Sequence, residues 1–157
     1  MSLKEEVAAL LKAKDLTIAV AEACTAGNLG YLRTSLPGSS AYFYGGILAY
    51  ARSVKRDVLG IPQEVLETHG SVPQVSAMEM AHRVRELCNT YIGVSTTGIA
   101  GPAGGSPHRP VALFYVALSA HDGYYQCKEH RFTYNDCNAN RKATAQAALS
   151  LVKHYLS

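Results

Sequence analysis

The sequence contains no apolar run near 18 residues, so it predicts no membrane-spanning helix and no membrane partner. Charged residues recur throughout residues 1–15, which does not match a secretory signal. The cysteines form no CxxC pair and share no zinc-finger spacing with histidine. We therefore expect reduced thiols, a cytoplasmic location, no bound metal and no cofactor. The four cysteines are Cys24, Cys88, Cys127 and Cys137.

Dense runs of positive charge are also missing. The formal net charge of +3 is spread along the chain, which gives nucleic-acid binding little support but is compatible with a small anionic substrate. A chain of 157 residues suits one domain, and we assign residues 1–157 to a single domain. A domain of this size can bury a core without disulfides or a metal.

Short apolar runs alternate with stretches of helical periodicity. Strands are expected at residues 16–22, 42–50, 91–97, 111–118 and 124–132. Helices are expected at residues 3–13, 27–35, 53–59 and 73–88, from residue 62, and at the C-terminal end around residues 145–156. Gly45 and Gly46 interrupt the second strand, which indicates a bulge or a close backbone approach. The pattern predicts an α/β fold, a three-layer α/β/α sandwich whose mixed, mostly parallel sheet has about five strands.

Three of the predicted loops follow the first three strands. They are AEACTAG at residues 21–27, the segment at residues 50–55 and the glycine-rich segment at residues 97–106. If these strands are parallel, the three loops meet at one edge of the sheet, where open α/β sheets bind ligands. The backbone N–H groups of Gly101, Gly104 and Gly105 could form a nest for a phosphate or an oxyanion, although a flexible surface loop has the same composition. The glycine spacing matches neither a P-loop nor a Rossmann fingerprint.

Lys55 lies five residues after Tyr50, near the predicted start of a helix. A lysine can act as a general base if burial or nearby cations lower its pKa, and Arg52 and Arg56 are its neighbours in sequence. A solvated surface lysine is the other interpretation.

Several of these segments together resemble one family, the C-terminal domain of the competence/damage-inducible CinA proteins, which includes stand-alone nicotinamide-mononucleotide deamidases. AEACTAG resembles the family's AESCTGG, and TGIAGPAGGSPHRPV at residues 97–111 resembles TGIAGPGGGSPEKPV. Further similarity lies in PGSSAYF at residues 37–43, in residues 46–50 followed by Lys55, in LGIP at residues 59–62 and in THG at residues 68–70. The resemblance runs from about residue 16 to the end of the chain.

The resemblance implies hydrolysis of the nicotinamide carboxamide to ammonia and nicotinate mononucleotide, without a metal. A serine attacks the amide, a lysine takes the serine proton, a tyrosine assists, and backbone N–H groups hold the oxyanion. The lysine position corresponds to Lys55 and the tyrosine position to Tyr50. The resemblance also implies a nucleotide ligand like nicotinamide mononucleotide and a homo-oligomer. The substrate-binding positions it implies are Cys24, Thr25, Gly27, Thr97, Gly98, Gly101, Gly104, Gly105, Ser106 and Arg141.

The sequence departs from the family at the position of the serine, which is Ala23. Removing the serine of a comparable hydrolase lowers turnover by a factor on the order of 10⁶. Two family glycines are Ala26 and Ala103, where a methyl group could narrow the pocket or limit positive φ. In the family's GDRxxxR segment, Arg141 is kept but the first arginine is Cys137, which puts one phosphate contact in doubt.

Cys24 is adjacent to the missing serine, but a shift of one residue points its side chain elsewhere, and the family has a cysteine there too. Thr25 is better interpreted as a helix cap or a ligand contact. Three functions stay open. The chain is an impaired amidase that keeps a nucleotide pocket, an active amidohydrolase that uses other residues, or a non-catalytic interaction module.

Overall fold

The computed structural model describes residues 1–67, 73–98, 112–132 and 136–157. Five strands form one sheet in the order β2-β1-β3-β4-β5. The strands are β1 (Ile18–Glu22), β2 (Phe43–Leu48), β3 (Ile92–Gly98), β4 (Ala112–Ala120) and β5 (Tyr125–Phe132). β1 pairs in parallel with β2 and β3, whereas β4 pairs antiparallel with β3 and β5. Four strands therefore run in one direction and β4 runs in the other, which confirms the mixed, mostly parallel sheet.

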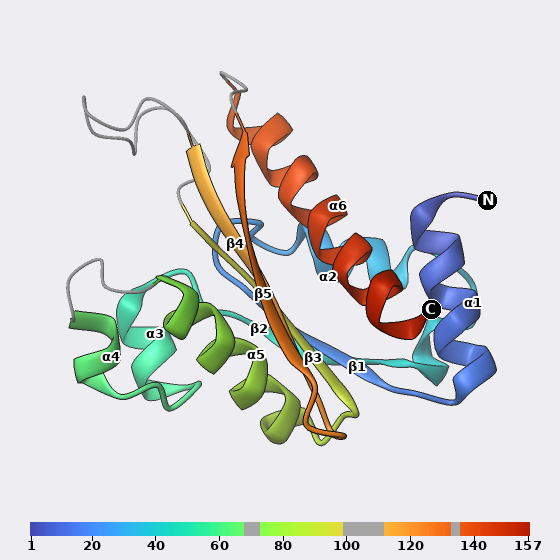
Figure 1. The fold of residues 1–157 in the computed structure, drawn as a ribbon, viewed down its shortest axis with the longest axis horizontal. Coiled ribbons are helices and arrows are strands. Elements are labelled where there is room, and N and C mark those ends of the chain that lie inside the picture. Colours follow the sequence, from blue (N-terminus) through green and yellow to red (C-terminus); the bar gives the residue numbers. More distant parts are fainter. Residues whose placement is uncertain (68–72, 99–111, 133–135) are drawn as a thin grey trace.

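Helices cover both faces of the sheet. They are α1 (Leu3–Lys14), α2 (Asn28–Thr34), α3 (Arg52–Asp57), α4 (Gln63–Glu67), α5 (Pro73–Cys88) and α6 (Cys137–Leu156). Figure 1 shows α1, α2 and α6 on one face and α3, α4 and α5 on the other, which confirms the three-layer arrangement. A short 3₁₀ helix, Ser39–Ala41, was not predicted from the sequence.

The core on the α6 side is built from the residues that the helical periodicity predicts. Ala145, Ala148, Leu149 and Val152 of α6 are all buried, at 1 % exposure or less. They belong to one apolar cluster with side chains of α1 and of strands β1, β3 and β4. The helix begins at Cys137, well before the apolar positions that mark it in the sequence, because the side chain of Asp136 caps its first turn.

The glycine pair in β2 allows the strand to approach β1 closely. A Cβ atom on Gly46 would lie 2.1 Å from the backbone oxygen of Val20, a distance that no side chain could tolerate. The register between the two strands shifts at the step from Ile18 to Ala19, where Ile18 pairs with Phe43 and Ala19 with Gly45. Both alternatives that the sequence offers, a bulge and a close approach, therefore occur here.

Within the described ranges, no helix combines the length and the apolar character needed to cross a membrane. The same ranges contain no group of three or more His, Cys, Asp or Glu side chains placed to hold a metal ion.

Candidate functional site

The AEACTAG segment at residues 21–27 forms a corner at the end of β1. This corner lies between the carboxyl ends of β2 and β3. The backbone N–H of Ala23 donates to the carbonyl oxygen of Thr96 at 3.0 Å, and the N–H of Ala49 donates to that of Glu22 at 2.8 Å. Because β1, β2 and β3 are parallel, their ends lie at one edge of the sheet. The segments that follow β1 and β2 therefore start side by side, as the sequence predicts.

Glu22 is the central polar group of this corner, with an exposure of only 2 %. Its Oε1 accepts hydrogen bonds from the N–H groups of Leu29 at 2.8 Å and Gly27 at 3.2 Å. Its Oε2 accepts from the N–H of Gly30 at 2.9 Å. The carboxylate thus satisfies the first turn of α2, whose N-cap residue, Gly27, has no side chain to do so.

Sequence reasoning missed Glu22 as a site residue. The signal was a single acidic residue at the end of an apolar strand, followed by a small-residue turn and a helix that begins without a capping side chain. A buried carboxylate needs several donors, and the nearest available ones are the N–H groups of that helix.

Thr25 joins this network and is 1 % exposed. Its hydroxyl donates to Oε1 of Glu22 at 2.6 Å and lies 2.7 Å from the hydroxyl of Thr96 on β3. Because the Thr25 proton goes to the carboxylate, the Thr96 hydroxyl is the donor in the second contact. Thr25 therefore ties the corner to β3, which is a structural use of the residue that we predicted as a cap or ligand contact.

The thiol of Cys24 is buried, with 2 % exposure. Burial raises the pKa of this thiol to about 12, and the positive charge of Lys55 opposes that rise only in part. The thiol is therefore protonated at neutral pH and closed to solvent, which are poor properties for a nucleophile.

Ala23 is 5 % exposed and its methyl group belongs to an apolar cluster. That cluster includes Ala49 after β2, Leu59 after α3 and Met80 of α5, with Val54 of α3 packed against it. A serine at position 23 would point its hydroxyl toward the α3 side of the sheet, because Ala23 packs there. The α3 side is also the side of Lys55.

Lys55 is half-buried, and its pKa lies below the ordinary lysine value. Burial is the main cause, and the positive charge of Arg52 adds to it. The direction is the one that a general base requires, because a larger fraction of the lysine is neutral. Tyr50 lies just before α3 and is 69 % exposed, so its side chain extends into solvent.

Ala26 has φ of 50°, which is in the left-handed region. The methyl group that we expected to limit positive φ does not prevent this conformation, although the backbone is strained by it. The side chain is exposed, and Ala26 is one of the residues that line a cleft between α2 and α6.

The cleft between α2 and α6 has a volume of about 680 Å³. Thr25, Gly27 and Arg141 all line it, together with Tyr31 and Lys142. The Nε of Arg141 donates to the carbonyl oxygen of Cys24 at 3.2 Å, which fixes the arginine at the corner. The predicted site residues therefore divide between two faces of the sheet. Ala23 and Lys55 lie on the α3 face, whereas Arg141 and the start of α2 lie on the α6 face.

The remaining predicted positions lie at the end of β3 and in the segment after it. Thr97 is 8 % exposed, and Gly98 is the last residue of that strand. Gly101, Gly104, Gly105 and Ser106 lie outside the described residues, as does Ala103.

Comparison with known proteins identifies the family. The sequence model of the CinA C-terminal domain matches residues 1–156. The chain belongs to the CinA C-terminal domain family. A CinA-like protein of Rippkaea orientalis is 44 % identical over 156 residues, which is 99 % of this chain and 38 % of that protein. A CinA-like protein of Trichodesmium erythraeum is 43 % identical over 99 % of this chain and 37 % of that protein. The chain thus spans between a third and two fifths of the length of these CinA relatives.

Solved CinA structures share the fold. A CinA superfamily protein from Klebsiella pneumoniae superposes with a TM-score of 0.91 at 28 % identity, covering 98 % of this chain and 95 % of the other. A competence/damage inducible protein from Agrobacterium tumefaciens has a TM-score of 0.89 at 33 % identity, covering 98 % and 93 %. The five-stranded mixed sheet with flanking helices is therefore the CinA architecture.

Proposed function

We propose that this CinA-family domain binds a pyridine nucleotide such as nicotinamide mononucleotide, and that its amide hydrolysis is impaired because position 23 lacks a nucleophile. The observation that carries the proposal is the environment of Ala23. Its methyl group belongs to an apolar cluster against which Val54 of α3 packs, and α3 is also the helix that carries Lys55. In this proposal, Lys55 is a base with no nucleophile at position 23 to activate.

The neighbouring side chains do not replace the missing hydroxyl. The Cys24 thiol is buried and has its pKa raised to about 12, so thiolate is scarce at neutral pH. The Thr25 hydroxyl already donates its proton to Glu22 at 2.6 Å. Attack by water assisted by Lys55 is the slow route that remains.

In this proposal the carboxamide of the ligand lies at Ala23 and its phosphate lies across the edge of the sheet in the cleft between α2 and α6, which Thr25 of the same corner also lines. Arg141 and Lys142 line it, and none of the described residues that line it is acidic. Two cations in a cleft without a carboxylate favour the phosphate of a mononucleotide. Lys142 is exposed and could supply the charge that is missing at Cys137.

The test of impaired catalysis is ammonia release from nicotinamide mononucleotide by the chain and by Ala23→Ser. We expect the unmodified chain to be slower by a factor on the order of 10⁶ than a serine-dependent relative, and Ala23→Ser to restore measurable turnover. Ala26→Ser is the matched control, because it places a hydroxyl on the same corner at an exposed position. Ordinary turnover by the unmodified chain would show instead an active amidohydrolase that uses other residues.

The pH dependence of Ala23→Ser tests the role of Lys55. A base must be neutral to accept the serine proton, so the rate should rise with pH through an apparent pKa below the ordinary value of about 10.5 for lysine. Adding Lys55→Met should remove both the activity and this rising limb. A rate that is unchanged by Lys55→Met would refute the assignment.

Calorimetric titration with nicotinamide mononucleotide tests the pocket separately from catalysis. Arg141→Gln and Lys142→Gln should each weaken binding at least about tenfold, since a charge-assisted hydrogen bond contributes roughly 1.5–3 kcal/mol. Lys4→Gln removes the same charge outside the cleft and should leave the affinity unchanged. An absence of binding heat would favour the third function, a non-catalytic interaction module.

A further inference from the structure

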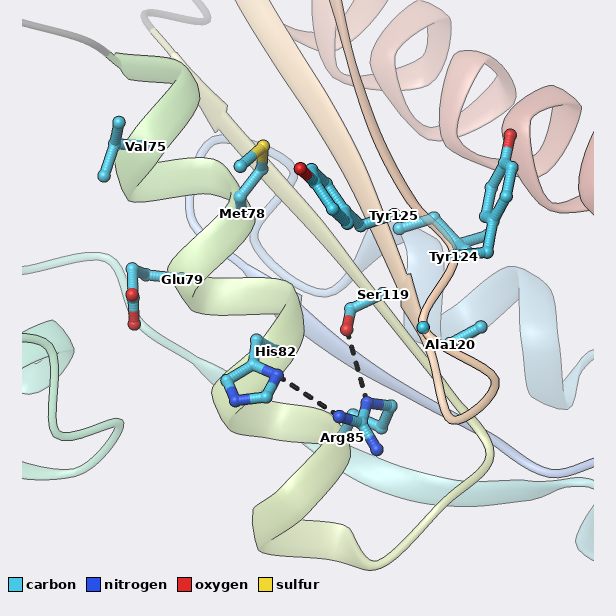
Figure 2. A pocket seen from close by; sticks show the side chains of 11 residues that line it. Val75, Met78, Glu79, His82, Arg85, Ser119, Ala120, Tyr124 and Tyr125 are labelled. Carbon is cyan, nitrogen blue, oxygen red and sulfur yellow. Dashed lines mark hydrogen bonds between the residues drawn. The ribbon is translucent and has the colours of Figure 1, made fainter.

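A second cavity, independent of the corner and of the α2–α6 cleft, lies between α5 and the β4–β5 hairpin. Its volume is about 330 Å³, within the range of roughly 300–1,000 Å³ that is typical of small-molecule sites. Figure 2 shows side chains of α5 on one wall and those of the hairpin on the other. It shares no lining residue with the proposed nucleotide pocket.

The fold places one arginine in this cavity with little freedom. A Cβ atom on Gly93 would lie 2.1 Å from the backbone oxygen of Ala81 and 2.7 Å from Cβ of Arg85, so α5 packs directly on the β3 backbone there. Gly93 pairs with Ser119 on β4. Arg85 therefore reaches Ser119 over a glycine, and its Nε donates to the Ser119 hydroxyl oxygen at 3.3 Å (Figure 2).

A histidine holds the same arginine from the other side. Nη2 of Arg85 lies 3.2 Å from Nδ1 of His82, and Nε2 of His82 lies 3.2 Å from a carboxylate oxygen of Glu86. Because a guanidinium can only donate, Nδ1 accepts and the ring proton is on Nε2, where it faces Glu86. The two contacts orient the plane of the guanidinium before any ligand arrives.

Arg85 keeps binding capacity after these contacts. A guanidinium has five N–H donors, of which Ser119 and His82 take two. No carboxylate in the described part of the chain forms an ion pair with it. The one acidic side chain that lines the cavity, Glu79, is paired with Arg83 at 2.9 Å. Arg85 is thus a cation that is held by neutral acceptors and available to an anion.

The opposite end of the cavity is apolar. Met78 of α5 and Tyr125 of β5 both line it, and Figure 2 shows the Tyr125 ring directed toward α5 on the side of Met78. Tyr125 is 65 % exposed, so its ring is open to a ligand from solvent. An aromatic ring could lie against the Tyr125 ring and the thioether of Met78.

We propose that this cavity is a ligand site for a small aromatic carboxylate. The carboxylate accepts two hydrogen bonds from the remaining donors of Arg85, and the ring of the ligand packs between Met78 and Tyr125. A fixed planar cation next to an apolar wall matches the two ends of such a molecule. The proposal does not depend on the function proposed for the strand edge.

Benzoate is the probe, and benzamide is its neutral counterpart of nearly equal shape. Both are titrated at millimolar concentrations into the isotopically labelled protein, and the amide resonances are followed by NMR. We expect saturable shifts with benzoate at Gly93, Ser119, Gly123 and Tyr125, and affinity for benzamide at least about tenfold weaker. Absence of shifts at these residues, or equal affinity for the two probes, would overturn the proposal.

Variants locate the site. Arg85→Gln should weaken benzoate binding about tenfold or more, whereas Arg131→Gln removes the same charge from an exposed position on β5 outside the cavity and should have no effect. Tyr125→Ala changes an exposed side chain that the fold does not need, and it should weaken binding several-fold. If Arg85→Gln does not fold, Tyr125→Ala decides, and an unchanged affinity in that variant would refute the site.

Discussion

Replacing Glu22 with glutamine isolates the electrostatic contribution of the corner, because the two side chains have nearly the same shape. In the native protein, Oε1 accepts hydrogen bonds from Thr25, Leu29 and Gly27, and Oε2 accepts from Gly30. An amide offers one acceptor and one nitrogen donor. In either orientation the nitrogen faces at least one N–H group, so at least one hydrogen bond is lost.

The number of hydrogen bonds lost sets the expected change in the free energy of unfolding. Losing one charge-assisted hydrogen bond costs roughly 1.5–3 kcal/mol, and the others weaken when the acceptor becomes neutral. These hydrogen bonds are also the interaction of the carboxylate with the first turn of α2, so that interaction is not added a second time. The expected decrease in the free energy of unfolding is therefore about 3 kcal/mol. That is a large part of the roughly 5–15 kcal/mol that stabilises a domain.

Equilibrium unfolding in urea measures the change. Glu5→Gln is the matched control, because Glu5 accepts the Ser2 N–H at 2.8 Å in an exposed capping box, where glutamine serves equally well. We expect the control to change the free energy of unfolding by less than about 1 kcal/mol. A decrease below about 1 kcal/mol for Glu22→Gln as well would refute the view that the buried carboxylate holds the corner together.

Three further changes test local features of the structure. Ala26→Gly should raise the free energy of unfolding by about 0.5–1 kcal/mol because φ is 50° there, whereas Ala143→Gly inside α6 should lower it by about 1 kcal/mol; thermal unfolding distinguishes the two signs. Cys24 should resist iodoacetamide at pH 8 in the native protein and react after denaturation, as measured by peptide mass spectrometry, since its thiol is buried and its pKa is about 12. Gly46→Ala should lower the free energy of unfolding in urea by about 3 kcal/mol, because the new methyl group would collide with the backbone of Val20, and native-like stability would contradict the close approach.

Much of the fold could be predicted because it depends on local patterns. The spacing of apolar residues predicted α5 at residues 73–88, and the structure has it at those residues. The turn at His121 to Gly123 predicted the β4–β5 hairpin, which is present. The 3₁₀ helix at Ser39–Ala41 was missed because a three-residue element has no periodicity to detect.

The candidate site was predictable only in part. The motif AEACTAG and Lys55 predicted a site at the edge of the sheet where β1, β2 and β3 end. The parallel order of these strands brings the corner and the α3 segment together there. The separation of Arg141 from Lys55 onto opposite faces could not be predicted, because it depends on which face of the sheet each helix covers. The hydrogen bonds of Glu22 and the position of Arg85 over Gly93 are also set by helix packing rather than by any sequence motif.

The sequence by itself determined that position 23 has no nucleophile, because a methyl group cannot attack a carbonyl in any fold. Only the tertiary structure decided what surrounds that methyl group and whether a neighbouring side chain could act as a nucleophile in its place. Thr25 and Thr96 are 71 residues apart, and their hydrogen bond exists because the register of β1 on β3 brings them together. The burial that keeps Cys24 protonated has the same origin, since a thiol loses contact with water only after distant segments pack over it.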